Sequence, residues 1–324
     1  MKIRATIHSS FPRIGEHPDE QKLRRATASL EEGKITLDEF TRVQDQLIDD
    51  IISIQERAGI EIVTDGLVRW YDSASHLARN LKGFEINGLL RFYDTNCYYR
   101  QPIAQDKIAL GDGALAQEIE YVAGKTERKI KAVMLGPLSM AAMSLNKSAL
   151  KFEELCLNLG EVLGRQAAKL SSAGASIIQI EEPWLVRNPE QFDPFLSSMD
   201  KFNQFKGNAK ILVALYFGDS GRLYDRLSEI PANMIGIDFT YSPGLLGRIL
   251  ADGFPKPIAF GILDGRNTRM EDAGKMARAI EPVLAKMNLS DCHITTSCGL
   301  EYLPRQYAIR KLELTAQVAK LING

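Results

Sequence analysis

The chain has 324 residues, of which 45% are apolar and 25% charged, so it can bury a substantial core as one large domain or two ordinary ones. Its 40 basic and 41 acidic residues give a net charge of −1 without a run of five like charges, which excludes a typical nucleic-acid partner. No apolar stretch approaches the roughly 20 residues of a membrane helix. The first residues lead directly into a strand pattern, so we expect a cytoplasmic protein with no membrane partner.

Short β-branched or apolar runs alternate along the chain with longer segments of helical period. Eight such runs occur, at residues 3–8, 60–65, 130–135, 176–181, 210–216, 234–238, 257–261 and 293–297. The continuous apolar run 211–215 is typical of a parallel strand buried on both faces. The pattern predicts a (β/α)8 TIM barrel formed by residues 1–324 as a single domain, with a doubly wound open sheet as the alternative.

Two regions depart from the repeat: a helical segment at residues 21–59, long enough for two helices, and an insertion at residues 67–129, between the second and third predicted strands. Part 84–99 of the insertion is rich in aromatic and β-branched residues and contains Asn87-Gly88, a dipeptide typical of a hairpin turn. The insertion therefore predicts a hairpin, either as a lid over the barrel mouth or as a surface ornament.

Polar residues stand at the carboxyl ends of the predicted strands, where a barrel concentrates its chemistry. In chain order they are His8, Ser9, Ser10 and Arg13, then Asp65 and Arg69, then Glu181 and Glu182, then Tyr216, Asp238, Arg266 with Asn267, and Cys298. The acids suit an ammonium group and the arginines suit a carboxylate, so the set as a whole indicates a small zwitterionic ligand. Each residue taken singly is explained as well by a strand-end cap or an ion pair between loops.

Six segments, in chain order, carry a family resemblance. They are 7–13 (Ile-His-Ser-Ser-Phe-Pro-Arg), Thr64-Asp65-Gly66 with Arg69 and Asp72, Leu135-Gly136-Pro137, 178–183 (Ile-Gln-Ile-Glu-Glu-Pro), 263–268 (Leu-Asp-Gly-Arg-Asn-Thr) and 297–300 (Ser-Cys-Gly-Leu). Together they resemble the catalytic carboxyl-terminal barrel of the cobalamin-independent methionine synthases and their short single-barrel relatives. The resemblance implies methyl transfer to a thiol, homocysteine in the usual members, held on zinc so that it stays a thiolate.

The resemblance also implies a set of zinc ligands, most of which this chain lacks. The family has a His-x-Cys pair after strand five, a glutamate after strand six and a cysteine after strand eight. In this chain Ala214 and Tyr216 occupy the positions of the His-x-Cys pair, and Asp238 occupies the position of the glutamate. Of the four ligands only the last cysteine, Cys298, is kept. A catalytic zinc normally has three protein ligands, so the sequence argues against tight zinc binding of the usual kind. A compensating site of His8, Cys298 and Asp238 remains open.

Two further departures concern the substrate and the methyl donor. Leu67 stands where the family has a glutamate that binds the ammonium of the amino acid, whereas Glu181 keeps a carboxylate where the family has an aspartate. Met143 stands where a tryptophan is expected near the pterin. The resemblance leaves two donors, methyl-folate and methylcobalamin, and the second would require a corrinoid protein as partner.

Three functions remain open at this stage. The first is a methyltransferase acting on an amino-acid thiol, with Cys298, Glu181 and Asp65 as catalytic residues and with Ser9, Ser10, Arg13, Arg69, Asp72, Glu182, Tyr216, Arg266 and Asn267 binding the substrate. The second is a metal-free enzyme of the wider barrel superfamily, a decarboxylase or lyase acting on an anionic substrate. The third is a protein that binds a corrinoid protein or an amino acid without turnover.

Overall fold

A single sheet of eight parallel strands forms the centre of the computed structural model, which describes residues 2–289 and 291–324. The strands are β1 (Arg4–Ala5), β2 (Ile62–Val63), β5 (Lys129–Leu135), β7 (Ala175–Glu181), β8 (Ile211–Leu215), β9 (Met234–Asp238), β10 (Ile258–Leu263) and β11 (His293–Thr296). Their order is β1-β11-β10-β9-β8-β7-β5-β2, and a parallel bridge between Thr6 and Ile62 joins the two outer strands. The predicted (β/α)8 barrel is therefore confirmed, and each of the eight predicted runs overlaps one of its strands.

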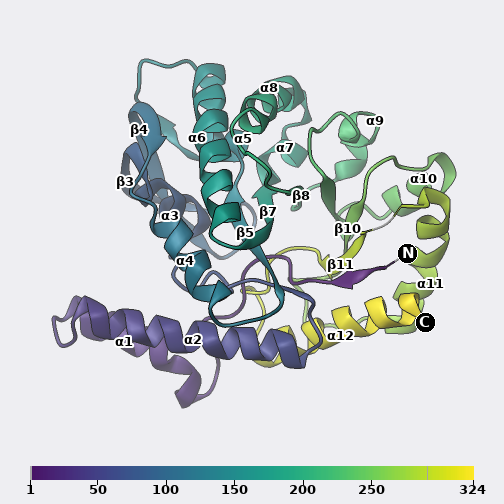
Figure 1. The fold of residues 1–324 in the computed structure, drawn as a ribbon, viewed down its shortest axis with the longest axis horizontal. Coiled ribbons are helices and arrows are strands. Elements are labelled where there is room, and N and C mark those ends of the chain that lie inside the picture. The colour runs from purple at the N-terminus through teal and green to yellow at the C-terminus, as the bar shows by residue number, and fades with distance from the viewer. Residues whose placement is uncertain (1, 290) are drawn as a thin grey trace.

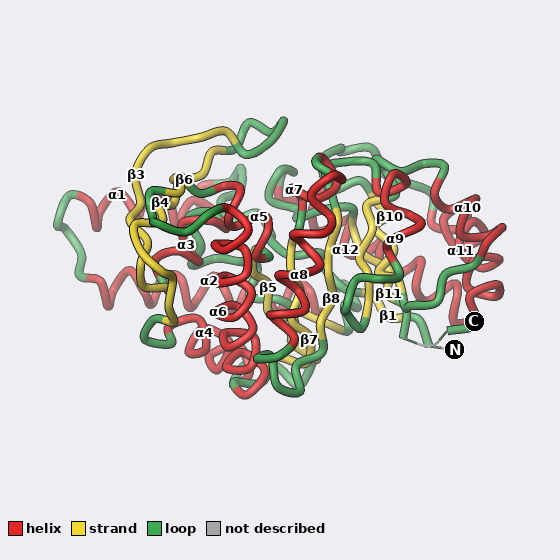
Figure 2. The backbone as a smooth tube through the Cα atoms, turned by 90° about the horizontal axis from the view of Figure 1, so that it is seen from above, coloured by secondary structure: helices red, strands yellow, loops and turns green. Residues whose placement is uncertain are grey.

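Helices surround the strands (Figures 1 and 2). They are α1 (Lys22–Glu31), α2 (Leu37–Arg57), α3 (Ser73–Arg79), α4 (Ala114–Ala123), α5 (Pro137–Met143), α6 (Phe152–Ser172), α7 (Pro183–Arg187), α8 (Phe192–Asn203), α9 (Tyr224–Leu227), α10 (Leu245–Asp252), α11 (Ala273–Met287) and α12 (Arg305–Asn323). Helix α2 starts at a capping box in which Thr36 and Glu39 each accept the other's backbone N–H. Its residues Ile48, Ile51 and Ile52 share one face at helical spacing and are buried in the core.

The insertion contains α3, the antiparallel pair β3 (Leu81–Arg91) and β4 (Tyr98–Leu110), and α4. The predicted hairpin is confirmed, but its predicted turn at Asn87-Gly88 is wrong. These residues lie inside β3, where the pairing register shifts, and Gly88 adopts a positive φ of 75° that suits a bulge. The turn spans residues 92–97 instead, where the Thr95 hydroxyl donates to the Phe92 carbonyl and accepts from Cys97 N–H.

The tip of this hairpin reaches the loops that follow β8, β9 and β10. The Phe92 ring lies 6.0 Å from that of Phe217, and Asp94 accepts hydrogen bonds from the Tyr241 hydroxyl at 3.1 Å and from Arg266 at 3.2 Å. The insertion therefore forms a rim over the barrel mouth, as in the first of the two interpretations.

One buried side chain of α6, that of Asn158, forms hydrogen bonds with the body of the hairpin. Asn158 accepts a hydrogen bond from Ile108 N–H at 2.7 Å and donates one to the Ile108 carbonyl at 3.0 Å. We expect Asn158→Ala to lower the free energy of unfolding by about 1–3 kcal/mol, because it leaves both buried backbone groups of β4 unpaired. Urea unfolding measures this loss. The exposed Asn96→Ala variant serves as the control and should change stability by less than about 0.5 kcal/mol; equal effects of the two substitutions would contradict the assignment.

Candidate active site

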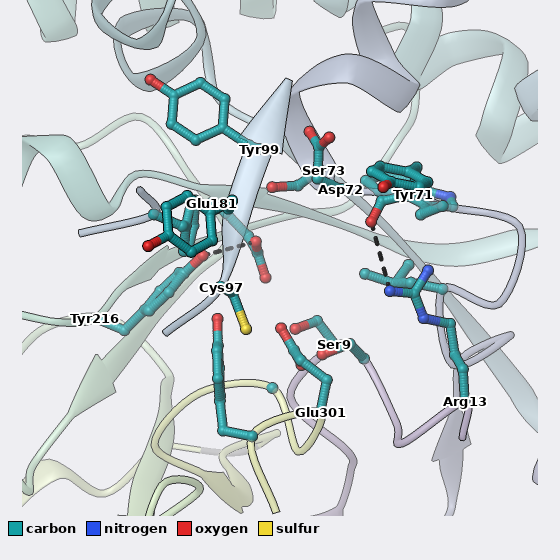
Figure 3. Close-up of a pocket in the computed structure, with 17 residues that line it drawn as sticks. Ser9, Arg13, Tyr71, Asp72, Ser73, Cys97, Tyr99, Glu181, Tyr216 and Glu301 are labelled. Carbon is teal, nitrogen blue, oxygen red and sulfur yellow. Dashed lines mark hydrogen bonds between the residues drawn. The ribbon is translucent and has the colours of Figure 1, made fainter. Parts of the chain in front are cut away.

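A cavity of about 100 Å³ opens at the carboxyl ends of the barrel strands (Figure 3). Six of the predicted site residues line it, namely Ser9, Ser10, Arg13, Asp72, Glu181 and Tyr216. Seven of the lining residues are aromatic: Trp70, Tyr71, Phe92, Tyr98, Tyr99, Tyr216 and Tyr302. An apolar wall with a few convergent polar groups is typical of a small-molecule site.

Two neighbouring side chains hold the Glu181 carboxylate in place by hydrogen bonds. The Tyr216 hydroxyl donates to Glu181 Oε2 at 2.9 Å (Figure 3). Gln179 Nε2 donates to Glu181 Oε1 at 3.1 Å. Burial raises the pKa of Glu181, while the hydrogen bonds from Tyr216, Ser9 and Gln179 act in the opposite direction. The site therefore presents a buried carboxylate whose pKa lies above that of an exposed glutamate.

His8 and Lys131 lie behind this carboxylate, inside the barrel. His8 Nδ1 is 3.1 Å from Ser9 Oγ and 3.6 Å from Glu181 Oε1. Burial, followed by the nearby Lys131 charge, lowers the pKa of His8 well below its ordinary value, so the ring stays neutral. Burial likewise lowers the pKa of Lys131 to about 7, and its Nζ donates to the Ile7 carbonyl.

The predicted metal ligands do not converge. Asp238 accepts from the backbone and hydroxyl of Thr240, at 2.9 and 2.6 Å, and so holds the loop after β9. Cys298 is fully buried, its Sγ packs against Gly265, and burial raises the pKa of its thiol well above 9.0. Among residues 2–289 and 291–324, no group of three or more His, Cys, Asp or Glu could hold a metal. The compensating site of His8, Cys298 and Asp238 is therefore not formed, and the residues present do not fit a zinc ion.

Two predicted residues of the second strand end lie outside the cavity. Asp65 accepts from Leu67 N–H at 3.0 Å and lies in a separate small pocket beside Glu118. Burial raises its pKa to about 6, with the Glu118 charge adding to the shift. Arg69 forms an ion pair with Asp45 of α2 at 2.6 Å. Both positions were inferred from the strand end, but the side chains turn toward the surrounding helices.

Glu182 is also buried and turns away from the cavity. Its oxygens accept from Leu138 N–H at 3.1 Å and from Ser139 N–H at 2.8 Å, which caps the first turn of α5. These bonds satisfy donors that a helix start leaves free, so the role of Glu182 in this structure is to hold α5.

Arg266 and Asn267, after β10, are occupied by loop contacts. Arg266 pairs with Asp94 of the hairpin tip and lies over the Phe217 ring, and Asn267 accepts from Arg269 N–H at 2.9 Å. They organise the rim and do not line the cavity.

The cavity also contains residues that the sequence did not indicate. Glu301 and Tyr302 follow the last strand, and Cys97 and Tyr99 come from the hairpin. Glu301 stands three residues beyond Cys298, so the strand-end rule could have found it. Cys97 and Tyr99 could not be found that way, because the sequence does not specify how an insertion folds over the mouth.

Parallel barrels with a cavity at this end of the strands define the class of TIM-barrel enzymes. Within this class, a family model described as the catalytic domain of cobalamin-independent synthases matches residues 11–321. The chain belongs to this family. Among curated proteins it is similar to the methionine synthases of Sulfurisphaera tokodaii and Saccharolobus solfataricus, each 26% identical over 315 residues, or 96% of this chain and 91% and 93% of theirs.

Solved structures show the same fold. A B12-independent methionine synthase from Shewanella, in complex with selenomethionine, has a TM-score of 0.81 at 18% identity over 100% of this chain and 98% of that one. A putative vitamin-B12-independent methionine synthase from Listeria monocytogenes has a TM-score of 0.77 at 16% identity, with full coverage of both chains. The resemblance and the expectation of a methionine synthase-like methyltransferase are thus confirmed. In the described part of the chain, no helix is long and apolar enough to cross a membrane.

The four cysteines should differ in reactivity, because Cys97 is exposed and the other three are buried. We expect iodoacetamide to modify Cys97 in the native protein and to leave Cys298 unmodified until the chain unfolds. Peptide mass spectrometry measures both rates, and Cys97→Ser should remove the rapid reaction. Modification of native Cys298 at the rate of Cys97 would contradict its placement in the core.

Glu301 should lower stability when it ionises. Burial, with the Glu181 charge adding to it, raises the pKa of Glu301 from 4.5 to about 7. Between these values the folded state keeps a proton that the unfolded state has released, so this group makes stability fall as pH rises from about 4.5 to 7. The change in the free energy of unfolding caused by Glu301→Gln, relative to wild type, should therefore be more favourable at pH 8 than at pH 5. Urea unfolding at the two pH values measures this change. The same difference in unfolding free energy between variant and wild type at both pH values would show that the pKa of this carboxyl group is not raised.

Proposed function

We propose that this protein transfers a methyl group from methyl-folate to the thiol of an amino acid of the homocysteine type. The observation that carries the proposal is the buried Glu181 carboxylate in the mouth cavity of a chain that belongs to this family. The family is described as cobalamin-independent, which favours methyl-folate over methylcobalamin and removes the reason for a corrinoid partner.

The reaction requires the thiol to lose its proton, because the thiolate is the nucleophile. The donor set at Cys298 and Asp238 does not fit a zinc ion, so we assign this proton transfer to Glu181. Glu181 takes the proton from the thiol, and the sulfur forms a bond to the methyl carbon as the carbon–nitrogen bond of the donor breaks. The nitrogen keeps the bonding pair and gains the proton that Glu181 took from the thiol, which gives the thioether and the demethylated folate and returns Glu181 to its ionised form.

The hydrogen bonds to Glu181 suit this role. Tyr216 and Gln179 fix the two carboxylate oxygens, so the base is held in place before the substrate arrives. The pKa of Glu181, raised by burial, lies closer to that of a thiol than an exposed glutamate's would. A smaller difference between the two makes the proton transfer more favourable.

The charges that line the cavity also bear on the choice of substrate. Three carboxyl groups, Asp72, Glu181 and Glu301, face one guanidinium, that of Arg13. The hydrogen bonds of Arg13 in the described chain are limited to a long one to the Tyr71 carbonyl, 3.5 Å, so most of its donors are available to a substrate carboxylate. This balance favours a zwitterion over the purely anionic substrate of a decarboxylase or lyase.

Methionine formation from L-homocysteine tests the proposal, with methyl-folate and methylcobalamin supplied separately. We expect product with methyl-folate. Absence of methionine with both donors would contradict the proposal, and stabilisation by homocysteine without product would favour the non-catalytic alternative.

Glu181→Gln should lower kcat by about 10²- to 10⁴-fold, because the amide cannot accept the thiol proton. Tyr216→Phe should cause a smaller loss, since it removes one hydrogen bond and leaves the carboxylate. Steady-state kinetics with both substrates measure the effects. The control is Glu127→Gln, an exposed residue just before β5 at the opposite end of the barrel. Retention of wild-type kcat by Glu181→Gln would exclude Glu181 as the base.

A further inference from the structure

Three side-chain oxygens converge on the backbone of Gly299, in the loop after β11. A Cβ atom added at Gly299 would overlap Ser10 Oγ and Glu301 Oε2 and would lie 3.0 Å from Ser9 Oγ. Ser9 and Ser10 follow the first strand, and Glu301 follows the last, so the two ends of the barrel sequence meet at this point. Figure 3 shows Ser9 and Glu301 at the same cavity. We call these three oxygens the Gly299 cradle.

Two atoms of the cradle have no partner within the described chain. Ser10 Oγ and Glu301 Oε2 are both buried and make no hydrogen bond. The whole Ser10 residue is only 7% exposed. Buried polar atoms are nearly always paired, because an unpaired one costs about 1–3 kcal/mol. Both residues line the mouth cavity, so a ligand in the cavity can supply the missing partner.

The chemistry of the cradle selects the kind of ligand group. An ionised carboxylate oxygen can only accept hydrogen bonds, and each serine hydroxyl can accept one while donating elsewhere. Ser9 has such a second contact, because its Oγ lies 3.1 Å from His8 Nδ1. Three acceptors around one point match the three N–H donors of a primary ammonium, and the charge of the ammonium favours the ionised form of Glu301.

Leu67, which lines the same cavity, is apolar and offers nothing to an ammonium group. Arg13 also lines the cavity and can receive the carboxylate of the same ligand. The cavity thus contains complementary groups for both charges of an amino acid, contributed by different loops.

We propose that Ser10, Glu301 and Ser9, gathered at Gly299, bind the amino group of the substrate and make the site specific for amino acids over their des-amino analogues. The inference rests on the proposed function, because that function supplies the amino-acid substrate.

The test compares the binding of two ligands by isothermal titration calorimetry. L-methionine carries the amino group, and 4-(methylsulfanyl)butanoate is the same molecule without it. Wild-type protein should bind L-methionine more tightly by about 10- to 100-fold, the range for a hydrogen bond to a charged group. Glu301→Gln should lose most of this preference, because it weakens the binding of L-methionine. The affinity for the des-amino analogue should change less than about twofold.

Matched variants separate specific binding from general damage. Ser10→Ala should also weaken the binding of L-methionine selectively. Its effect should be smaller than that of Glu301→Gln, because it removes a neutral acceptor. The control Glu127→Gln should leave both affinities unchanged, and thermal unfolding confirms that each variant folds. Gly299→Ala should also weaken the binding of L-methionine, because its methyl group would overlap Ser10 Oγ and Glu301 Oε2 and displace them.

Each remaining outcome decides the question. If Glu301→Gln weakens the binding of both ligands equally, or leaves the binding of both unchanged, the proposed role of the Gly299 cradle is wrong. If homocysteine is methylated while Glu301→Gln keeps the preference for L-methionine, the proposed function stands and the cradle fails. If the preference depends on Glu301 but no methyl transfer occurs, the cradle stands and the proposed function fails. No binding of L-methionine by the wild type overturns both.

Discussion

Closure of the barrel is the constraint on which the candidate site depends. The pairing of β1 with β11, and the bridge from Thr6 to Ile62, bring the loops after the first and last strands together at the mouth. Ser9 and Ser10 come from one loop and Glu301 from the other, and Glu181 reaches the same cavity from β7. In a doubly wound open sheet the first and last strands would not pair, and these residues would not share a cavity.

The sequence predicted the barrel and part of the site for identifiable physical reasons. Each strand is a short apolar run separated from the next by a helical segment, a pattern that a parallel barrel requires. Ser9, Ser10, Glu181 and Tyr216 were found because they stand at strand ends. The same rule failed for Cys298 and Asp238, because it places a residue at the mouth without fixing the direction of its side chain. Local loop contacts hold both side chains away from the cavity.

What the sequence could not predict depends on tertiary packing. Asn87-Gly88 is a strong turn signal, yet pairing across the whole hairpin moves the turn to residues 92–97 and makes Gly88 a bulge. Cys97 and Tyr99 therefore reach the cavity from a segment whose position no periodicity fixes. Glu301 lies outside the predicted set because it stands beyond the end of the last predicted strand run, three residues after Cys298 in the same loop, and its unpaired buried oxygen is a feature of the tertiary structure.

The side chains around the cavity differ in kind from those of a site that relies on a metal. The residues that would hold zinc do not converge, whereas carboxyl groups and tyrosines surround the cavity. Such a site can bind a zwitterion by charge complementarity and move a proton at Glu181. The conclusions drawn for substrate, base and specificity all require the amino acid to occupy this one cavity.

A crystal structure of the protein soaked with L-methionine tests that claim most directly. The account predicts density for the ligand in the mouth cavity, with its amino group at Ser10 and Glu301, its carboxylate toward Arg13 and its sulfur near Glu181. Density for the ligand at Cys298 and Asp238, or outside the barrel mouth, would contradict it.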